Sequence, residues 1–409
     1  MRILFLSNFY PPASRGGYEQ WCQEVLEGLR RRGHDVFVVT SDYGKSQLST
    51  PEPAWVERSL HLEMELSSLK NAFQFFTHRK KHELENLNHI SRLIADFKPD
   101  TVLVWGMWNL QRSIVALAEE RLPGRVAYYM GDYWPFLPNQ FENYWKASAR
   151  NPLTGLPKLI LKPFALHSLA REKLQDLKME HVLFATSFMQ REYRQKGISP
   201  KNSKVIYGAV DTKPYLNEHK KSDTKLSLLS IGRLNPDKGI HTAIEAVGCL
   251  VRENIQNIHL KVVGDSEPEY VEHLRELTVR ENAASFVDLL PAQPKEILPA
   301  LYQQADVFLF TSIWPEPFGR VIVEAMASGV AVIGTKVGGA AEILVENENA
   351  LTFPAGDAKA LAEQIKKLIG SPELRERLSK AGRETAVNKF DLERMTTEIE
   401  SYLETLVKS

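Results

Sequence analysis

The amino-acid sequence predicts an α/β protein made of two doubly wound domains, each with a parallel sheet. The chain has 409 residues, which is more than one hydrophobic core ordinarily holds. In both halves, short apolar and β-branched runs alternate with helical patterns, as expected for parallel sheets that helices cover on both faces. A polar, turn-rich segment around residues 200–224 separates the two series.

The first half repeats the order of strand, turn and helix. The buried run RILFLS (2–7) is followed by the glycine-containing turn RGGYE (15–19) and an amphipathic helix near Tyr18–Arg32. Further strands are expected at four apolar runs, DVFVVTS (35–41), DTVLVWG (100–106), VAYYMGD (126–132) and HVLFATS (181–187).

The second half starts the same order again. Strands are expected at KLSLLSIGRL (225–234), IHLKVVGD (258–265), ASFVDLL (284–290), DVFLFTS (306–312) and VAVIGT (330–335). We therefore expect one Rossmann-like domain at residues 1–205 and a second at 206–388, which face each other across a cleft. The helical pattern in 389–409 has no strand left to cover, so we expect this helix to return to the first domain.

Composition and charge narrow the class of protein. The 51 Lys and Arg residues balance the 51 Asp and Glu residues, so no overall field favours nucleic acid. Cys22 and Cys249 stand far apart in apolar segments, which favours buried free thiols over a disulfide and fits a reducing compartment. The first apolar run is too short for a signal-peptide core, and no run reaches the ~20 residues of a membrane span. We expect a cytoplasmic protein.

Two cations stand in one loop between a strand and a helix. In SIGRLNPDKGI (230–240), Arg233 and Lys238 precede a helix that begins near Gly239. A guanidinium and an ammonium beside a helix N-terminus can neutralise a diphosphate, although two solvated loop cations would look the same. In RGGYE, Gly16 and Gly17 let the backbone approach an anion, and a simple tight turn is the alternative.

A pair of acids brackets the start of a later helix. In WPEPFGRVIVEAMASG (314–329), Glu316 lies in a loop that neighbouring prolines keep extended, and Glu324 lies inside the helix that begins near Gly319. A carboxylate can accept hydrogen bonds from a vicinal diol such as ribose. Alternatively, Glu316 caps the helix and Glu324 lies on a solvated face. Because apolar residues flank Glu324, a charge there needs a partner.

The same segment carries a family resemblance. EPFGRVIVE resembles the E-x7-E signature of retaining GT-B glycosyltransferases of family 4 (glycosyl transferases group 1), and GRLNPDKG resembles their phosphate-binding loop. RGGYE, VGDSEPE, YQQADVFLFTS and VIGTKVGGAAEIL follow in the order of the family. The resemblance covers nearly the whole chain. It implies a GT-B fold and transfer of a sugar from a nucleotide diphosphate sugar to an acceptor hydroxyl, with retention at the anomeric carbon.

The resemblance also implies roles for individual residues. Arg233 and Lys238 would hold the donor diphosphate, capped by Gly16 and Gly17. Glu324 would bind the ribose, and Glu316 would contact the donor sugar. The remaining donor contacts would come from the loops and backbone at Gly232, Gly264, Leu290, Pro291, Phe318, Gly319, Arg320 and Val321.

The sequence departs from the family after VAYYM. Many members have a histidine there that contacts the donor sugar, whereas this chain has Gly131 followed by Asp132. Asp132, or a residue from WGMWN (105–109), is the candidate substitute. Asp132 is assigned a catalytic role, and capping of the next helix is the alternative for it. The acceptor-side candidates are aromatic or polar, and core packing is the alternative for the aromatic ones: Trp105, Trp108, Asn109, Tyr133 and Trp134.

Further expectations concern partners. The basic segment PKLILKPFALHSLAREK (157–173) either packs on its own domain or also touches a membrane at the inner face, since acceptors in this family are often lipid-linked. The sequence has no Asp-x-Asp pair, and we expect neither a metal nor another cofactor. Family frequency favours a UDP-sugar donor and a role in cell-surface or exopolysaccharide synthesis. A GDP-sugar (mannosyl) transferase and a non-catalytic nucleotide-sugar-binding protein are the alternatives.

Overall fold

The computed structural model describes residues 1–13, 16–48, 50–65, 71–148, 152–172, 175–216, 225–265 and 267–408, without the side chains of residues 152–154. Parts of the motifs above lie outside the described residues, namely Arg15, Lys173, residues 217–224 and Ser266. The chain divides into two compact units. Unit 1 comprises Met1–Phe184, Glu192–Ile206 and Thr396–Ser409, and unit 2 comprises Ala185–Arg191 and Tyr207–Met395.

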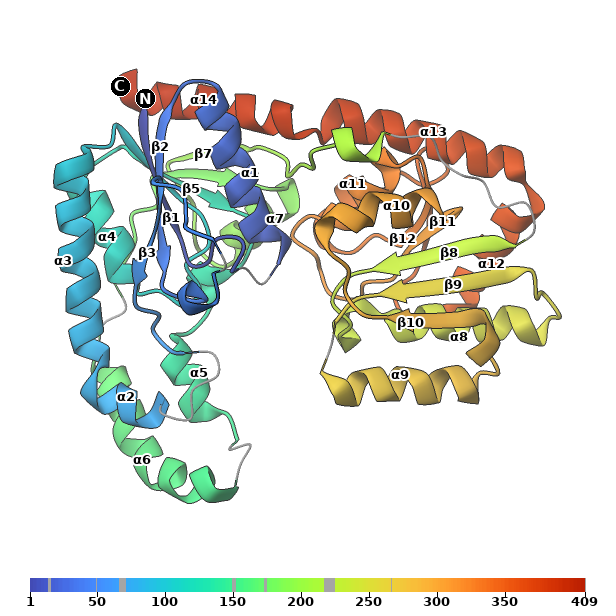
Figure 1. Cartoon of the computed structure of the whole chain (residues 1–409), viewed down its shortest axis with the longest axis horizontal. Helices are drawn as coiled ribbons and strands as arrows, with labels where there is room; N and C mark the ends of the chain where they lie inside the picture. Colours follow the sequence, from blue (N-terminus) through green and yellow to red (C-terminus); the bar gives the residue numbers. More distant parts are fainter. Residues whose placement is uncertain are drawn as a thin grey trace. The chain divides into compact units, whose positions relative to one another are not determined.

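Unit 1 contains a parallel sheet that has seven strands in the described residues, in the order β3-β2-β1-β4-β5-β6-β7 (Figure 1). The strands are β1 (Arg2–Ser7), β2 (Asp35–Ser41), β3 (Val56–Leu60), β4 (Thr101–Val104), β5 (Val126–Met130), β6 (His181–Phe184) and β7 (Asn202–Val205). The helices are α1 (Gly17–Arg31), α2 (Asn71–Thr77), α3 (Arg79–Phe97), α4 (Arg112–Arg121), α5 (Gln140–Lys146) and α6 (Pro152–Arg171), and α7 (Ser187–Gln195) begins in unit 2.

Unit 2 repeats this architecture with six strands in the described residues, in the order β10-β9-β8-β11-β12-β13. The strands are β8 (Leu226–Ile231), β9 (Ile258–Val263), β10 (Val287–Leu290), β11 (Val307–Phe310), β12 (Ala331–Thr335) and β13 (Leu351–Phe353). The helices are α8 (Ile240–Arg252), α9 (Pro268–Arg280), α10 (Leu298–Gln303), α11 (Arg320–Ala327), α12 (Ala358–Gly370) and α13 (Pro372–Lys389).

Both sheets are buried on their two faces, as the apolar runs predict. Four consecutive residues of β1, from Ile3 to Leu6, have no exposed surface. A strand that alternated between core and solvent could not bury consecutive side chains, so helices must cover both faces of the sheet. In unit 2, Leu260 of β9, Val247 of α8 and Ile365 of α12 belong to one core cluster.

The C-terminal helix returns to unit 1, as expected. Helix α14 (Leu392–Lys408) begins in unit 2, and from Thr396 its residues belong to unit 1. Glu400 on this helix forms ion pairs with Arg32 at 2.7 Å and with His34 at 2.6 Å.

Two further findings concern the cysteines and the helices. Cys22 is a buried free thiol, as predicted, whereas Cys249 is free but only half-buried. Among the described helices, none is both long and apolar enough to span a bilayer.

Candidate active site

The loops after β8 and β11 lie at the carboxyl edge of the unit 2 sheet. On one side of β8 the sheet continues with β9 and β10, and on the other side with β11, β12 and β13. The strand order therefore reverses between β8 and β11, and open parallel sheets bind ligands outside such a switch point. These two loops carry Arg233, Lys238 and Glu316.

Backbone hydrogen bonds join the two loops. The carbonyl of Asp237 accepts hydrogen bonds from the amides of Ile313 at 2.9 Å and Trp314 at 3.1 Å. The Thr311 hydroxyl donates to the carbonyl of Lys238 at 2.8 Å. The main chain therefore determines where Lys238 stands relative to residues 311–319.

Close contact between the loops explains Gly239. This residue precedes α8 with φ of 64°, in the left-handed region. A Cβ atom at Gly239 would lie 2.1 Å from the carbonyl oxygen of Thr311. A side chain here would push the Lys238 loop away from the β11 loop.

The side chains of Lys238 and Glu316 meet at this junction. The Lys238 ammonium forms an ion pair with Oε1 of Glu316, and the Ser312 hydroxyl donates to the same oxygen at 3.0 Å. Both charged side chains are mostly buried, while Arg233 in the same β8 loop is exposed. The sequence-predicted cation and acid thus lie in direct contact within unit 2. Ser312 was missed, because a serine after a strand carries no distinctive signal.

Glu324 is buried and paired. Glu324 is 5% exposed, so the alternative that it lies on a solvated face of the helix is wrong. The Tyr302 hydroxyl donates to Oε2 at 3.0 Å, and Nε of Arg320 donates to Oε1 at 3.1 Å. Burial and the neighbouring Glu324 charge raise the pKa of Tyr302 well above its ordinary value, so this hydroxyl stays protonated and donates. Each carboxylate oxygen retains a second lone pair for a further donor.

Glycines shape both the turn before α11 and the loop that packs against this turn. Gly319 precedes α11 with φ of 112°. The amide of Gly339 donates to the carbonyl of Glu316 at 2.6 Å, and a Cβ at Gly338 would lie 2.3 Å from that oxygen. The paired glycines in VGGA therefore let residues 338–339 pack directly against the Glu316 loop. Adjacent glycines were a visible signal, yet neither was among the predicted site residues.

The other predicted donor-binding residues lie at the same sheet edge or at the start of α11. A Cβ at Gly264 would lie 1.8 Å from the carbonyl oxygen of Gly232, so the loops after β8 and β9 are in backbone contact. The amide of Gly264 donates to the carbonyl of Leu290 at 3.0 Å, and Pro291 after it is exposed.

Phe318 and Val321 lie on either side of the α11 N-terminus. The Phe318 side chain is 2% exposed and packs on Phe390, with ring centroids 5.6 Å apart. Val321 is half-buried. Phe318 can therefore offer a ligand its backbone only, as the family resemblance implies.

The sheet of unit 1 has its own switch point, between β1 and β4. The amide of Asn8, after β1, donates to the carbonyl of Gly106, after β4, at 2.6 Å. Gly16 is the N-cap of α1 with an extended backbone, and Gly17 is its first residue. The two glycines thus stand at a helix N-terminus, where free amides favour an anion.

Tyr18 fills the space beside Gly131. The amide of Gly131 donates to the Tyr18 hydroxyl at 3.3 Å, and that hydroxyl donates to the carbonyl of Tyr129. A Cβ at Gly131 would lie 2.8 Å from Cε2 of Tyr18. The tyrosine of RGGYE therefore leaves no room for a histidine at position 131, which gives a physical reason for the departure from the family.

Asp132 combines capping with a raised pKa. Its carboxylate accepts a hydrogen bond from the amide of Trp134, so the capping alternative describes one of its contacts. Its Oδ1 is buried and has no hydrogen-bond partner among the described residues. Burial, with Glu19 nearby, raises the pKa of Asp132 well above the ordinary aspartate value. An acid with this pKa can hold a proton and donate a hydrogen bond.

Two acceptor-side candidates are corrected to structural roles. Trp105 is fully buried, its ring stacks on Tyr129 with centroids 4.5 Å apart, and its Nε1 donates to the carbonyl of Tyr18 at 2.8 Å. Asn109 is also fully buried, and its amide exchanges hydrogen bonds with the backbone of Met64. Neither side chain can reach an acceptor, because both complete the packing of unit 1.

The other aromatic candidates lie nearer a cavity of about 170 Å³ at the carboxyl edge of the unit 1 sheet. Trp108 and Trp134 line it, and Nε1 of Trp134 is buried with no hydrogen-bond partner in the described part of the chain. Tyr133 is half-buried between Asp132 and Trp134 and does not line it. Other lining residues include Glu63, Arg79, Glu83, Arg112, Asn139, Phe141, Leu169 and Glu172.

Glu63 is a titratable side chain that lines this cavity. The amide of Gln140 donates to Oε2 at 3.1 Å and Nδ2 of Asn139 donates to Oε1 at 3.0 Å. Burial raises the pKa of Glu63 to about 7. Sequence reasoning missed Glu63, because no motif surrounds it and only the fold brings it to the carboxyl edge.

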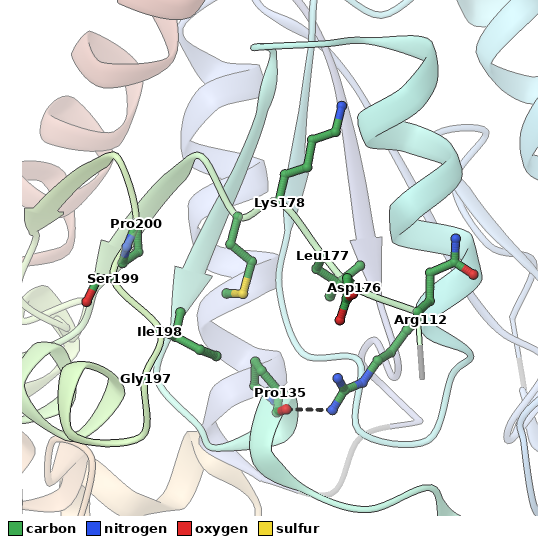
Figure 2. Close-up of a pocket in the computed structure, with 11 residues that line it drawn as sticks. Arg112, Pro135, Asp176, Leu177, Lys178, Gly197, Ile198, Ser199 and Pro200 are labelled. Carbon is green, nitrogen blue, oxygen red and sulfur yellow. Dashed lines mark hydrogen bonds between the residues drawn. The ribbon is translucent and has the colours of Figure 1, made fainter. Parts of the chain in front are cut away.

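A second, larger cavity of about 280 Å³ holds none of the predicted site residues (Figure 2). It lies where the segments before β6 and β7 meet Arg112 and Pro135. The guanidinium of Arg112 points to the carbonyl of Pro135 and donates to it at 2.5 Å. The Arg112 guanidinium already donates to a backbone carbonyl, so the larger volume does not make this cavity the better candidate for a ligand site.

One group of side chains resembles a metal site by composition. Donor atoms of His61, His82 and Glu85 lie within 4.8 Å of one another. The two imidazole rings are stacked, with centroids 4.2 Å apart and planes 21° apart. A metal ion binds in the plane of an imidazole ring, and one ion cannot lie in two stacked planes, so this arrangement is not built for coordination.

Two successive units, each with a parallel sheet and a switch point in its strand order, are the architecture of the GT-B class of proteins. A solved structure of Anabaena Alr3699/HepE in complex with UDP and glucose has the same fold. It matches 98% of this chain and 99% of its own length with a TM-score of 0.69, at 21% sequence identity.

Two family models match successive parts of the chain. The model for Glycosyltransferase Family 4 matches residues 15–214, and the model for Glycosyl transferases group 1 matches residues 211–385. Together the two models match residues 15–385, and the chain belongs to the group 1, family 4 glycosyltransferases.

Curated relatives match the chain over part of its length. Spore coat protein SA of Bacillus subtilis is 33% identical over 49% of this chain and 58% of its own. The capsular polysaccharide biosynthesis glycosyltransferase CapM of Staphylococcus aureus is 33% identical over 46% of this chain and 49% of its own. The chain thus spans about half the length of the curated relatives that it matches.

Proposed function

We propose that this protein transfers a sugar from a nucleotide diphosphate sugar to a hydroxyl of a glycan or lipid-linked acceptor. The observation that carries the proposal is the junction in unit 2, where Lys238 contacts Glu316 at the switch point of the sheet. A cation held beside a helix N-terminus suits a departing diphosphate, and an adjacent carboxylate suits sugar hydroxyls. Membership of the family supports the same reaction.

In the proposed reaction, the bond from the anomeric carbon to the phosphate oxygen breaks and a bond to the acceptor oxygen forms. Lys238 and Arg233 stabilise the charge that develops on the diphosphate. The acceptor proton passes to the departing phosphate oxygen on the same face of the sugar, so the configuration is retained. Asp132, with its raised pKa, takes the part of the family histidine by donating a hydrogen bond to the donor sugar.

A UDP-sugar is the proposed donor. The HepE structure holds UDP and glucose, and CapM acts in capsular polysaccharide biosynthesis. By analogy, we propose a role in cell-surface or exopolysaccharide synthesis. The two free cysteines fit a reducing compartment, so we place the reaction on the cytoplasmic side, with peripheral contact to the inner membrane face.

Release of UDP from UDP-sugars in the presence of acceptors tests the proposal. Arg233→Ala and Lys238→Ala are each expected to lower turnover by about 10²-fold or more. Lys359→Ala, a change at an exposed lysine on α12, is the matched control and should retain turnover. Near-normal turnover in both variants would contradict the proposal. A protein that is stabilised by UDP-sugars but releases no UDP with any acceptor would instead be a nucleotide-sugar-binding protein.

A separate assay tests which nucleotide base the donor carries. Thermal shifts against UDP-, GDP- and ADP-sugars rank the donors directly. Stabilisation by GDP-mannose alone would replace the UDP-sugar proposal with a mannosyltransferase of the same fold.

A further inference from the structure

The cavity beside Trp108 and Trp134 combines aromatic faces with charged groups. Trp108, Trp134 and Phe141 line it together with carboxylates and guanidiniums. Aromatic faces with a few fixed polar groups are the usual lining of a site for a small polar ligand. Trp134 is 3% exposed, and its Nε1 has no hydrogen-bond partner among the described residues. A buried donor without a partner costs free energy, so an oxygen atom of a bound ligand would stabilise it.

Hydrogen bonds hold the polar wall of this cavity in place. The amide of Glu63 donates to the carbonyl of Asn109 at 2.9 Å, and Nε2 of Gln140 donates to the carbonyl of Trp108 at 2.9 Å. The Glu63 carboxylate in turn accepts from the Gln140 amide and from Nδ2 of Asn139. The segments that follow β3, β4 and β5 are thus tied together, so the polar groups have fixed positions before a ligand binds.

The charges of the lining do not balance. The charged side chains that line the cavity are Glu63, Glu83, Glu142, Glu172, Arg79 and Arg112. Nη2 of Arg79 donates to Oε1 of Glu172 at 2.6 Å, and Glu142 pairs with Lys146 on the same helix. Two acids, Glu63 and Glu83, and one cation, Arg112, remain. With both acids ionised, the lining is one positive charge short.

Glu63 and Glu83 form no ion pair within the described part of the chain. Each holds neutral donors instead, and the Ser113 hydroxyl donates to Oε1 of Glu83 at 2.6 Å. Oε2 of Glu83 accepts no hydrogen bond from any described residue. The Arg112 guanidinium donates to the carbonyl of Pro135 rather than to either acid. Both carboxylates therefore have lone pairs for a charged donor.

A proton on Glu63 makes up for the missing charge. Burial is the main cause that raises the pKa of Glu63 to about 7, and the charge of Glu83 adds to it. The amide of Gln140 and the charges of Arg112 and Arg79 lower this pKa but do not cancel the effect of burial. Below pH 7 the carboxyl group of Glu63 is therefore mostly protonated, which brings the lining to neutrality.

We propose that this cavity recognises an acceptor that carries a protonated amine, namely an amino sugar without an N-acetyl group, and that Glu63 and Glu83 bind its ammonium. This proposal rests on the proposed function and names the class of acceptor. An ammonium donates three hydrogen bonds, and those to carboxylates are the strong, charge-assisted kind. When it binds, its charge takes the place of the Glu63 proton, which is released to solvent. A phosphate or carboxylate fits poorly, because it would add a negative charge beside two acids.

Three simple sugars with the same ring test the proposal on the full chain. They are methyl α-glucosaminide, its N-acetyl derivative and methyl α-glucoside, and only the first carries a charge. In ligand-observed NMR titrations at pH 7, the wild type is expected to bind the glucosaminide at least about tenfold more tightly than either neutral sugar.

Two variants remove one charge each. The preference for the glucosaminide should fall below about threefold in Glu63→Gln and in Glu83→Gln, because each loses a charge-assisted contact. Glu83→Gln keeps the wall intact even if Glu63→Gln disturbs the hydrogen bonds to Asn139 and Gln140, and melting temperatures show which variants are folded. Glu120→Gln, at an exposed acid on α4, is the matched control and should retain the full preference.

The pH dependence of binding separates recognition from a structural role. Below pH 7 the empty cavity holds the Glu63 proton, and binding of the ammonium has to release it. The affinity for the glucosaminide should therefore rise from pH 5 to pH 7, by up to about tenfold per pH unit. Amines stay protonated over this range, since they titrate above about 7.7. The neutral sugars, and the glucosaminide with Glu63→Gln, should show no such rise.

Three outcomes would overturn the proposal. They are equal binding of the charged and neutral sugars by the wild type, the full preference in both variants, and tighter binding of methyl glucuronide than of the glucosaminide. The titrations contain no nucleotide, so they do not depend on transfer. If only the transferase proposal fails, the preference for the amine remains but no UDP is released. If only the amine proposal fails, neutral acceptors support UDP release as well as amine acceptors do.

Discussion

The ammonium group of Lys238 and the carboxylate of Glu316 form an ion pair at the switch point of the unit 2 sheet, and Ser312 donates to the same carboxylate oxygen at 3.0 Å. Seventy-eight positions separate the two residues in sequence. Because the backbones of their loops are also hydrogen-bonded, the pair has a defined position before any donor arrives. Such preorganisation lets charged groups stabilise a transition state without reorganising.

Changing Glu316 should separate donor binding from catalysis. In Glu316→Gln, a negative charge near the proposed diphosphate is removed, so UDP should bind as tightly or up to about tenfold more tightly. Turnover should fall by about 10²-fold if this carboxylate contacts the donor sugar. Calorimetry with UDP and initial-rate kinetics measure the two effects. Glu348→Gln, at an exposed acid of unit 2, should change neither, and full turnover in Glu316→Gln would contradict the assigned role.

Catalysis should not require a metal. Arg233, Lys238 and the amides at the start of α11 are proposed to carry the charge compensation that a divalent ion supplies elsewhere. Turnover should therefore be the same within about twofold after EDTA treatment. A loss of activity that added Mg²⁺ or Mn²⁺ restores would show that these groups are insufficient.

The contact between Tyr18 and Gly131 predicts a coupling between the two positions. Gly131→His should lower stability by about 1–3 kcal/mol, because its Cβ would lie 2.8 Å from the Tyr18 ring. In a double-mutant cycle with Tyr18→Ala, the combined loss should be smaller than the sum by more than about 1 kcal/mol. Gly370→His is the control, since nothing lies within 4 Å of a Cβ there. Additive losses would mean that Tyr18 does not occupy the histidine position.

Glu63 should make stability depend on pH. Its pKa is raised from 4.5 to about 7, so the folded state binds this proton more tightly than the unfolded state. The resulting stabilisation is complete below about pH 4.5 and is lost as the pH rises through about 7.

Unfolding of the wild type and of Glu63→Gln between pH 5 and pH 8 tests this expectation. The wild type should lose about 1–2 kcal/mol more stability over this range than the variant, given that the residue is only half-buried. Glu120→Gln, at an exposed acid on α4, should behave like the wild type. Parallel pH profiles for the wild type and Glu63→Gln would show that Glu63 ionises normally.

The sequence predicted the central strands well and the edge strands poorly. The run RILFLS coincides with β1, and DVFVVTS coincides with β2, because strands inside a covered sheet are continuously apolar. The missed strands β3, β7 and β13 all lie at sheet edges. They are short, and β7 has the sequence NSKV with no fully buried residue. An edge strand buries less surface, so it has a weaker apolar pattern.

The candidate site was predictable where it depends on strand ends. Loops after parallel strands lie at one edge of the sheet, so the expected strands place the loops of Lys238 and Glu316 at the same edge. Their direct contact depends on the pairing of β8 with β11, which the structure shows. The hydrogen-bond partner of Glu324, in contrast, could not be predicted from the positions of the strands. Tyr302 reaches it from α10, and no local pattern indicates how α10 packs on α11. Trp105 and Asn109 were misassigned for the same reason, since burial depends on tertiary packing.

The central claim is that the switch point of unit 2 binds the diphosphate of a nucleotide-sugar donor. Calorimetric titration of UDP and of uridine into the wild type and the Arg233→Ala/Lys238→Ala variant tests it most directly. We predict that the variant binds UDP about 10²-fold or more weakly, because two charge-assisted contacts are lost, while uridine affinity changes by less than about twofold. A variant that binds UDP as tightly as the wild type would contradict the claim.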